Sequence, residues 1–534
     1  MNVAIDFGTS NTVVDVYYNG NDIILCDRDG KHFFPSVVEF KESNKLSFGF
    51  AALHNYWMKE NVIRSVKRVM GLPMNSDDLR LYQKDCTTKI FAGPDGFPRF
   101  DISFFRPEGI SPTEVISRFY SFIGNRIQDI YGKPIENLIL TIPAFYTQDQ
   151  RNETMKAAKQ AGIAKKVHLV GEPVAAAYYH HTENYDPSRV ILVLDIGAGT
   201  FDICLMRNEN GEMQAIGQGG RRQLGGEDIT KLLCDWVEKE FEKVYRRRLI
   251  AFPPGSRLYR KKKEALRMLV EEAKCNLSRN PSTVIHIKTD DFIMNYKAPA
   301  DSSDYDYMDD DEESKEFDLT LTLETVRQVV SGFLRDVKTS ILNTLTGNNI
   351  QKESISEVIL VGGCSHFIPF QEVAREIFGD HKVRQADKPE EIVARGALRV
   401  LEKSILTGEH RLIQKLTHSY GTLLNDGSYA EIIPSGTTFP TNQVFSRKLY
   451  QIPTPDRLYP HAMVGVFVRD DINGGEPQEY NPFTVTNLST DTRNEVYVNF
   501  MIDGNGIIFA EVRQKIGNPV VMPKTEMRRA VEFN

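Results

Sequence analysis

The feature that most constrains the fold of this chain is a glycine-rich turn that occurs twice. Residues 4–10 (AIDFGTS) and 194–202 (LDIGAGTFD) each place an Asp-x-Gly turn directly after an apolar strand pattern. Glycine suits such turns because backbone N–H groups approach phosphate oxygens closely only where no Cβ intervenes. One copy alone would more often be an ordinary tight turn. Two copies, each opening one half of a long α/β region, predict two lobes that close on one nucleotide.

The aspartate of each turn is placed to hold a metal ion. Asp6 and Asp195 each follow an apolar strand, and Mg²⁺, which dehydrates reluctantly, would be held mainly through water. A third glycine pair, Gly362-Gly363, follows another buried strand and suits the adenosine side of a nucleotide. The sequence lacks the pattern G-x-x-x-x-G-K-[ST], which argues against a P-loop enzyme.

The chain divides into an α/β region and an all-β region. About the first 405 residues alternate β-branched runs with helical patterns, and the runs 191–194 and 358–361 are typical of strands buried on both faces. Apolar residues recur at helical spacing over 232–244 and 326–345, which predicts one helix over each range. After about residue 409, short alternating segments separated by turn residues predict a small β domain.

We therefore expect four segments along the chain. They are a nucleotide-binding domain over 1–405, an interdomain linker over 406–417, a β domain over 418–525 and a tail over 526–534. A strongly acidic stretch at about 299–316 cannot bury a core, so we expect a solvated insertion between two strands. A docking site for a basic partner is the alternative interpretation of that stretch.

Composition argues against several classes of function. A formal net charge of −7 argues against a general nucleic-acid or acidic-membrane binder. No apolar run approaches the roughly 20 residues that span a bilayer, and the N-terminus has no signal-peptide pattern. The six cysteines form no CxxC pair, so neither a disulfide framework nor a zinc site is indicated. A reducing cytoplasm is the expected location.

Further motifs accompany the two turns in a fixed order. They lie at 6–11, 66–71, 142–145, 171–177, 195–202, 224–228, 271–278 and 360–363, and in the β region at 439–441 and 502–507. With these motifs the sequence resembles the seventy-kilodalton heat-shock chaperone family, within the actin and sugar-kinase superfamily. The resemblance implies a two-lobed, actin-like ATPase domain followed by a β-sandwich domain. It also implies weak, magnesium-dependent ATP hydrolysis that controls the binding of extended, apolar peptide segments in the β domain.

The resemblance assigns roles to the residues at matching positions. The catalytic group would be Lys67, Glu172, Asp195, Thr200 and Asp202, with Lys67 as a cation near the γ-phosphate. Asp6 and Asp195 would hold Mg²⁺ through water. ATP or ADP would contact Asp6, Gly8, Thr9, Ser10, Asn11, Gly197, Ala198, Gly199, Gly225, Gly226, Glu271, Lys274, Ser278, Gly362, Gly363, His366 and Glu390.

Two smaller groups of residues complete the assignment. Glu271, Lys274 and Ser278 are spaced to share one helix face, which in the family meets the ribose and adenine. Pro143 and Arg151 match a proline and an arginine that, in the family, relay the nucleotide state to the peptide domain. A nucleotide-exchange factor is a further partner that the resemblance implies.

The adenine end departs from the family pattern. The family usually holds adenine between two arginine side chains, and the matching positions here are Cys275 and His366. Nucleotide affinity is therefore expected to be weaker. Cys364 would lie nearby, which leaves open a redox control with Cys275, although ordinary packing cysteines are preferred.

The parts that couple the domains also depart from the family. The linker keeps only Leu412, Ile413 and Leu416 for docking, so the coupling is expected to be altered or weaker. His168 stands where the family has an arginine used by J-domain co-chaperones, which argues against stimulation by such a partner. The sequence ends at Asn534, so we expect no α-helical lid and rapid release of bound peptide.

Three functions fit the sequence to different degrees. In a chaperone of this family, Leu423, Phe445 and Met463 would line the peptide cleft, although core packing explains each of them equally well. A nucleotide-gated protein that serves one specific partner, with general client binding lost, is the alternative. A sugar kinase would need a base beside a sugar pocket, and the sequence offers no candidate.

Overall fold

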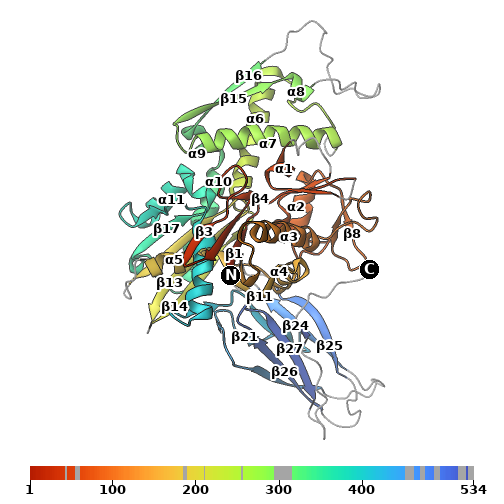
Figure 1. Ribbon diagram of the computed structural model, residues 1–534, viewed down its shortest axis with the longest axis vertical. Coiled ribbons are helices and arrows are strands. Elements are labelled where there is room, and N and C mark those ends of the chain that lie inside the picture. The colour runs from red at the N-terminus through yellow and green to blue at the C-terminus, as the bar shows by residue number, and fades with distance from the viewer. Residues whose placement is uncertain are drawn as a thin grey trace.

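The computed structural model places two α/β lobes side by side above a β domain (Figure 1). The first lobe is built around a six-stranded sheet and the second around a seven-stranded sheet. The structure describes residues 1–42, 45–54, 61–183, 189–209, 211–253, 256–293, 316–451, 462–469, 476–485, 494–514 and 525–526.

The sheet of the first lobe has the strand order β11-β10-β1-β2-β3, with β4 pairing to β2. β10 is parallel to β1 and β11, while β2 is antiparallel to β1 and β3. The bounds are β1 Asn2–Phe7, β2 Asn11–Tyr18, β3 Asn21–Ile24, β4 Phe34–Pro35, β10 Ile135–Ile142 and β11 Ala164–Gly171.

The sheet of the second lobe repeats this arrangement strand for strand. Its order begins β18-β17-β12-β13-β14, with β17 parallel to β12 and β18 and with β13 antiparallel to β12 and β14. The bounds are β12 Val190–Ile196, β13 Thr200–Glu209, β14 Glu212–Arg222, β17 Glu357–Val361 and β18 Val383–Gln385. The repeat inferred from two short turns therefore extends over five strands in each lobe.

Two helices pack between the sheets. α5 (Glu172–Glu183) contacts β12 and β13 of the second lobe, whereas α12 (Ile392–Arg399) contacts β1, β2 and β10 of the first. Ala4 and Ile139 from the first sheet share a buried cluster with Val193 from the second. Because this cluster joins both sheets and both helices, the lobes meet across a continuous apolar interface.

The outer helices of the first lobe begin and end at recognisable signals. α3 (Pro112–Tyr131) starts after Ser111, whose hydroxyl accepts from the Glu114 N–H, and stops at Gly132 in the left-handed region. α4 (Gln148–Ala161) starts with a capping box between Thr147 and Gln150. The remaining elements of this lobe are α1 Phe50–Leu53, α2 Asp77–Asp85, η2 Val66–Val69, β5 Val38–Phe40, β6 Leu46–Phe48, β7 Val62–Ile63, β8 Ile90–Ala92 and β9 Pro98–Phe100.

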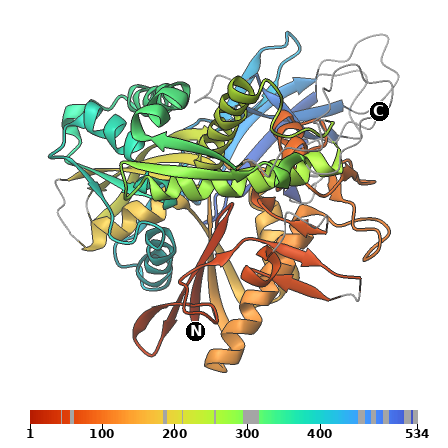
Figure 2. The same cartoon turned by 90° about the horizontal axis from the view of Figure 1, so that it is seen from above.

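The outer part of the second lobe carries two long helices, and α7 crosses the middle of the view from above (Figure 2). These are α6 (Gly226–Tyr245) and α7 (Arg257–Asn276), which pack on the pair β15 (Ser282–Lys288) and β16 (Glu316–Thr322). The predicted acidic insertion falls between these two strands, and its residues before Glu316 lie outside the described ones. The other elements are α8 Asp290–Ile293, α9 Leu323–Val329, α10 Ser331–Gly347, η3 Lys352–Ser354, η4 Gly363–His366, α11 Ile368–Phe378 and η5 Val400–Leu406.

One helix prediction was wrong in this region. The range 326–345 was expected to form a single helix, but it is divided between α9 and α10 at Val330. The apolar spacing continues across the break because residues on both sides of it, Val326 and Phe333, face the same core.

The β domain consists of two four-stranded sheets with a common core. One has the order β21-β20-β24-β25 and the other β23-β26-β27-β28. Alternate residues of β26, from Val496 to Ile502, are buried in that core. The bounds are β20 Ser419–Leu423, β21 Tyr429–Ile433, β23 Phe445–Gln451, β24 Ala462–Arg469, β25 Gln478–Val485, β26 Asn494–Ile502, β27 Ile508–Gln514 and β28 Thr525–Glu526.

The linker is a strand of the second lobe. β19 (Leu412–Lys415) pairs in parallel with β14, with Leu412 opposite Met213. The next strand, β22 (Thr438–Phe439), pairs with β19 and extends the sheet to seven strands. Leu412 and Leu416 are both buried. The segment between the domains is thus held by backbone hydrogen bonds as well as by apolar side chains.

Candidate nucleotide-binding site

A cleft of about 540 Å³ lies between the lobes. All three glycine turns open into it. Of the residues predicted to form the site, those that line the cleft are Asp6, Gly8, Thr9, Ser10, Asn11, Lys67, Glu172, Asp195, Gly197, Ala198, Gly199, Thr200, Gly226, Glu271, Lys274, Ser278, Gly362, Gly363, His366 and Glu390. Asp202 and Gly225 are not among the lining residues and lie behind them.

The two repeated turns touch each other at the bottom of the cleft. Each closes by one hydrogen bond, from the Gly8 N–H to Asn11 and from the Gly197 N–H to Thr200, both 3.0 Å long. A Cβ on Gly199 would lie 2.7 Å from the Thr9 hydroxyl oxygen, so only glycine allows this contact. Two turns from opposite lobes therefore line the same part of the cleft.

The third glycine turn supports one of the aspartates. Gly362 has a φ of 81°, which favours glycine, and a Cβ there would lie 2.5 Å from an Asp195 carboxylate oxygen. The Gly226 N–H donates to the Gly197 oxygen at 3.0 Å, which joins the start of α6 to the second turn. The carboxylate of Asp195 and the turn around it are thus held from two sides.

Lys67 pairs with Glu172 in the middle of the cleft. Lys67 lies in η2 of the first lobe and Glu172 is the first residue of α5; both are buried, and the lysine Nζ donates to a glutamate oxygen. Burial opposes the charge on Lys67, but Glu172, Tyr146 and Asp6 raise its pKa above the ordinary value. Burial raises the pKa of Glu172 to about 8, in spite of the attraction of Lys67. Lys67 therefore supplies a permanent positive charge at this point.

Three further carboxylates surround this pair. Asp6 accepts from the Thr141 hydroxyl at 2.6 Å, and Asp202 accepts from the Ala144 N–H at 2.8 Å, which leaves its other oxygen buried without a hydrogen bond. Burial raises the pKa of Asp6, Asp195 and Asp202. A buried carboxylate group with a raised pKa is stabilised by a cation.

The donor chemistry of this group fits magnesium. Carboxylate oxygens together with water are the ligands that Mg²⁺ prefers. Within the described ranges no three His, Cys, Asp or Glu side chains converge into a direct metal-binding group. Asp6 and Asp195, the two aspartates that line the cleft, are the residues that would hold the ion through water.

The end of the cleft predicted to hold adenosine is built by α6 and α7. Lys274 is buried and its Nζ donates to the Gly226 oxygen at 3.0 Å and to Glu271 at 2.8 Å. Glu271 also accepts from the Thr230 hydroxyl. The prediction that Ser278 shares a helix face with these residues was wrong, because α7 ends at Asn276 and Ser278 lies in the following turn. Ser278 lines the cleft nevertheless.

The substituted adenine positions also line the cleft. Cys275 is exposed and its thiol donates to Glu271 at 3.7 Å. The His366 ring is bound to Gln385 at 2.9 Å and lies 3.8 Å from a Glu390 oxygen. Burial raises the pKa of the Cys364 thiol to about 11. A thiol with so high a pKa is rarely ionised, which favours packing over redox chemistry for this cysteine.

Ion pairs join the two lobes beside the repeated glycine turns. These pairs were not predicted from the sequence. In the first lobe, Arg64 precedes η2 and Arg68 lies within it. In the second lobe, Glu227 and Asp228 lie in the first turn of α6. Arg64 lies 3.4 Å and Arg68 also 3.4 Å from Glu227, and Arg68 lies 3.2 Å from Asp228. Burial raises the pKa of Glu227, but the arginines lower it overall to about 2. The only signal in the sequence was the presence of these residues beside or within the motifs at 66–71 and 224–228.

The β domain docks on the first lobe through polar contacts and through Ile507, which is buried in the core of that lobe. Arg151 donates to the Asn505 oxygen at 3.0 Å, and Gln148 donates to the Gly506 oxygen at 2.9 Å. The Leu169 N–H donates to the Asn505 side chain at 2.9 Å. His168 precedes Leu169 and is half-buried, and burial lowers its pKa. Arg151, which was predicted to act as a relay, thus contacts the β domain directly.

Two of the residues predicted to line a peptide cleft lie in one sheet of the β domain, and the third lies in the other sheet. Leu423 lies at the end of β20 with 38% of its surface exposed, and Phe445 begins β23 in the other sheet, partly buried against the common core. Met463 lies in β24, opposite Thr484, and its side chain is outside the described residues. A shared cleft for these residues stays a prediction.

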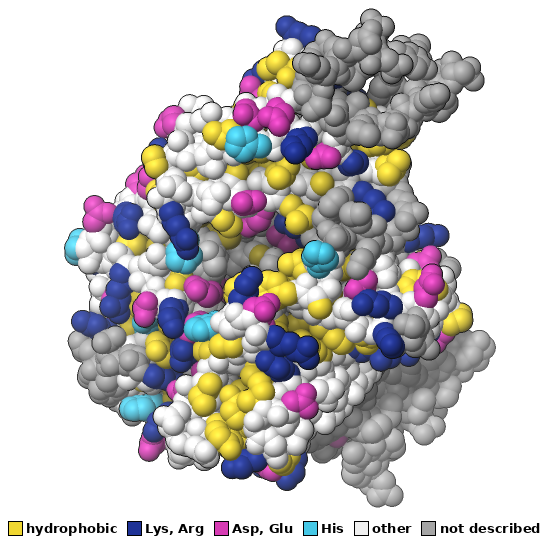
Figure 3. Space-filling model, turned by 45° about the horizontal axis from the view of Figure 1, so that its top comes forward, with side chains coloured by type: hydrophobic (Ala, Val, Ile, Leu, Met, Phe, Trp, Pro, Cys, Tyr) yellow, Lys and Arg dark blue, Asp and Glu magenta, His cyan; other side chains and the backbone are white. Residues whose placement is uncertain are grey.

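The surface is mixed in charge. Figure 3 shows Lys and Arg side chains interspersed with Asp and Glu over the face that it presents. Within the part of the chain that the structure describes, no helix is long and apolar enough to cross a membrane.

Comparison with known proteins identifies the family. The model of the family described as Hsp70 protein matches residues 2–522. The chain is 25% identical over 549 aligned positions to "Chaperone protein DnaK" of one strain of Thermus thermophilus, covering 99% of this chain and 82% of the relative. The same values hold for the protein of that name from a second strain of the same species. The chain belongs to the Hsp70 family, whose members are ATP-binding chaperones with ATPase activity.

Proposed function

We propose that this chain is a magnesium-dependent ATPase in which nucleotide state controls the binding of extended, apolar peptide segments by the β domain. The observation that carries the proposal is the meeting of two glycine turns from opposite lobes above a buried Lys67–Glu172 pair. Such a site binds the phosphates from both sides, so the nucleotide itself holds the lobes together.

The residues of the cleft would share the chemistry as follows. The turn N–H groups and the hydroxyls of Thr9 and Thr200 bind and orient the phosphates. Lys67 stabilises the charge that develops on the γ-phosphate, and Glu172 holds the Lys67 ammonium in place. Asp202 lies behind the lining residues and would complete the acidic group around the magnesium ion and the water. Mg²⁺, when bound through water by Asp6 and Asp195, would neutralise charge on the phosphates.

Two contacts support a link from the cleft to the β domain. β19 is a strand of the second lobe's sheet, while Arg151 binds the 503–506 turn from the first lobe. Movement of one lobe relative to the other would therefore strain one of these contacts. In the β domain we expect the peptide to bind as an added strand.

Measuring ATP turnover with Mg²⁺, with and without a panel of apolar peptides, tests the proposal. We expect slow turnover that the peptides change, and peptide affinity that differs between the ATP and ADP states. The absence of peptide binding in both nucleotide states would rule out the chaperone mechanism. Turnover without Mg²⁺ would refute the metal assignment separately.

A nucleotide-gated protein for one specific partner is the second candidate. It is favoured by the adenine end, where Cys275 and His366 replace an arginine pair, and by His168 at the J-domain position. Nucleotide-dependent contacts between the domains without any binding of the peptide panel would favour this candidate over the first.

A further inference from the structure

The outer part of the second lobe carries a dense run of positive charge. Between Arg246 and Lys263 the sequence has eight Lys and Arg residues and no Asp or Glu. Seven of the eight have described side chains: residues 246–248 follow α6, and residues 260–263 lie in the first two turns of α7. We call these seven residues the basic surface, because every one of them is at least partly exposed.

The two parts of the basic surface meet beside one carboxylate. Glu238 lies in α6, and Lys263 and Arg248 both act to lower its pKa, although burial raises that pKa overall. Because both cations act on the same carboxylate, the two parts lie close together. Over residues 235–263 the sequence has ten Lys and Arg residues against four Asp and Glu. The neighbouring carboxylates therefore offset less than half of the positive charge.

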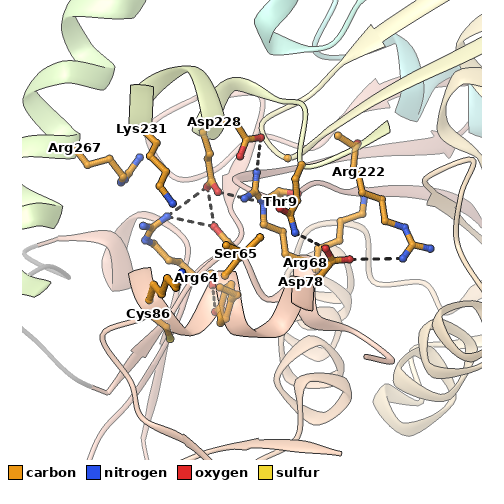
Figure 4. A pocket seen from close by; sticks show the side chains of 18 of the residues that line it. Thr9, Arg64, Ser65, Arg68, Asp78, Cys86, Arg222, Asp228, Lys231 and Arg267 are labelled. Carbon is orange, nitrogen blue, oxygen red and sulfur yellow. Dashed lines mark hydrogen bonds and ion pairs between the residues drawn. The ribbon is translucent and has the colours of Figure 1, made fainter. Parts of the chain in front are cut away.

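The cations nearer the glycine turns are in a different situation. Arg64 lies 2.7 Å from Glu264 and Arg68 lies 3.2 Å from Asp228, and Figure 4 shows both arginines in the pocket beside the turns. Carboxylates of the second lobe thus offset their charge. Among the residues that the structure describes, none places a carboxylate within 4.0 Å of the side-chain nitrogens of residues 246–248. The charge of these three arginines is therefore available to an acidic partner.

The described chain stops and resumes beside the basic surface. It stops after α8, where the Lys262 Nζ donates to the backbone oxygen of Asp291. It resumes at β16, where the rings of Phe317 and Tyr245 pack with their centroids 5.8 Å apart. Lys262 belongs to the basic surface and Tyr245 directly precedes it. Both ends of the intervening residues, 294–315, are therefore anchored next to this surface.

The intervening residues carry the opposite charge. Residues 301–316, which we call the acidic segment, have nine Asp and Glu side chains and one lysine, and all but Glu316 lie outside the described residues. Asp301 is eight residues beyond Ile293, a separation that a chain spans with at most about 29 Å. Attachment at both ends gives a tethered segment an effective concentration on the order of 1 mM. A contact that would be weak between separate molecules is therefore well populated within one chain.

We propose that the basic surface binds an acidic peptide segment and that its occupant is the chain's own residues 301–316. Lys and Arg side chains would pair with the Asp and Glu side chains in many weak, exposed contacts, so the binding should weaken steeply as salt is added. An occupied basic surface would no longer attract other polyanions. The proposal uses no residue of the nucleotide cleft and does not depend on the proposed ATPase function.

The first experiment uses a fluorescent synthetic peptide with the sequence of residues 301–316. Its binding is measured by anisotropy to the unmodified chain and to a full-length neutral-segment variant, in which the eight acidic residues between 301 and 313 become Asn or Gln. The variant should bind the peptide at low salt at least tenfold more tightly than the unmodified chain, whose surface is already occupied. Binding to the variant should be lost at about 0.5 M NaCl.

Charge removal locates the binding in the neutral-segment variant. Arg246→Gln combined with Arg248→Gln should raise the Kd for the peptide about fivefold. Lys165→Gln combined with Lys166→Gln is the matched control, since both lysines are exposed on β11 of the first lobe. Thermal unfolding shows whether each protein is folded. Equal losses in the two double variants would overturn the basic surface as the site.

Two further outcomes would overturn the choice of occupant. One is equal peptide binding by the unmodified chain and the neutral-segment variant, or binding by neither. The other is a single-stranded oligonucleotide of 16 bases that binds the unmodified chain more tightly than the peptide binds the variant, which would identify a nucleic acid as the partner.

The second experiment detects the contact within the unmodified chain. A carbodiimide joins a lysine amine to a carboxylate that touches it, and mass spectrometry then identifies the linked residues. We expect links from Lys261, Lys262 and Lys263 to the acidic segment at low salt, and few of them at 0.5 M NaCl. Links from the acidic segment to lysines over the whole surface, without preference for these three, would contradict the proposal.

Discussion

The two lobes repeat one arrangement of five strands, yet equivalent positions on their second strands carry different residues. Asp6 is paired with Val13, whereas Asp195 is paired with Asp202. Two residues further on, Ala4 is paired with Asp15, whereas Val193 is paired with Cys204. The repeated backbone provides two similar glycine turns, and the side chains on it make the cleft asymmetric: the second lobe supplies an extra carboxylate, and the first supplies Lys67.

The asymmetry should be strongest at Lys67. Lys67→Ala removes the buried cation that is paired with Glu172, so ATP turnover is expected to fall about 10²- to 10³-fold. Steady-state turnover under saturating Mg²⁺ and ATP measures this. Lys243→Ala, on the exposed face of α6, is the control. Unchanged turnover in Lys67→Ala would show that the catalytic site has been misassigned.

The linker strand gives the next largest expected effect, because only the second lobe has one. Leu412 is 4% exposed, and Leu412→Ala should destabilise the docked linker by about 2–3 kcal/mol, the lower part of the range for buried leucines. Faster amide exchange over 412–415, with β3 of the first lobe unaffected, is the expected result. Leu424→Ala, at an exposed position, is the control. Equal exchange in both variants would contradict the docking role.

The pH dependence of the free energy of unfolding tests the difference between the lobes at Asp15. This side chain is fully buried, neither of its oxygens has a hydrogen-bond partner, and burial raises its pKa to about 7. The stability that its protonated form contributes is therefore complete below the unfolded pKa near 3.8 and is lost as the pH rises through 7. Between pH 6 and 8 the free energy of unfolding should fall by about 1 kcal/mol more in the unmodified chain than in Asp15→Asn.

Denaturant unfolding of both proteins at several pH values measures that difference. Cys204→Ser, at the equivalent position of the second lobe, should show the same pH dependence as the unmodified chain. Parallel curves for Asp15→Asn and the unmodified chain would mean that Asp15 stays ionised throughout.

The smallest expected effect lies at the end predicted to hold adenine, where both substituted residues come from the second lobe. Cys275→Arg combined with His366→Arg restores a pair of guanidinium groups for stacking. A gain of about 0.5–1 kcal/mol, or two- to fivefold in ADP affinity, is expected. Titration of ADP measures it, with Cys275→Ser as the control. Weaker binding in the double variant would show that the cleft holds adenine in another way.

The sequence was most informative where function depends on short backbone turns. The Asp-x-Gly turns and the Gly362-Gly363 pair could be predicted because glycine marks a close approach whatever the rest of the fold. The five-strand repeat could not, since pairing between β1 and β10 joins residues more than 130 positions apart. For the same reason the contacts of Arg68 with Asp228 were invisible, although both lie in predicted motifs.

Two misjudged regions have a local cause. The helix spacing over 326–345 continues across a break, because both halves face one core, and periodicity alone does not report the break. The linker was assessed by counting apolar residues, but β19 is also held by backbone pairing to β14, which depends little on side-chain identity.

The position of β19 has a consequence for solubility. A sheet edge presents unpaired N–H and C=O groups that can pair with a strand of another chain. While the linker is docked, β19 covers part of the outer edge of β14, and β22 lies beyond it. Any state in which the linker leaves would expose that edge, so the segment that joins the two domains also protects the molecule from self-association.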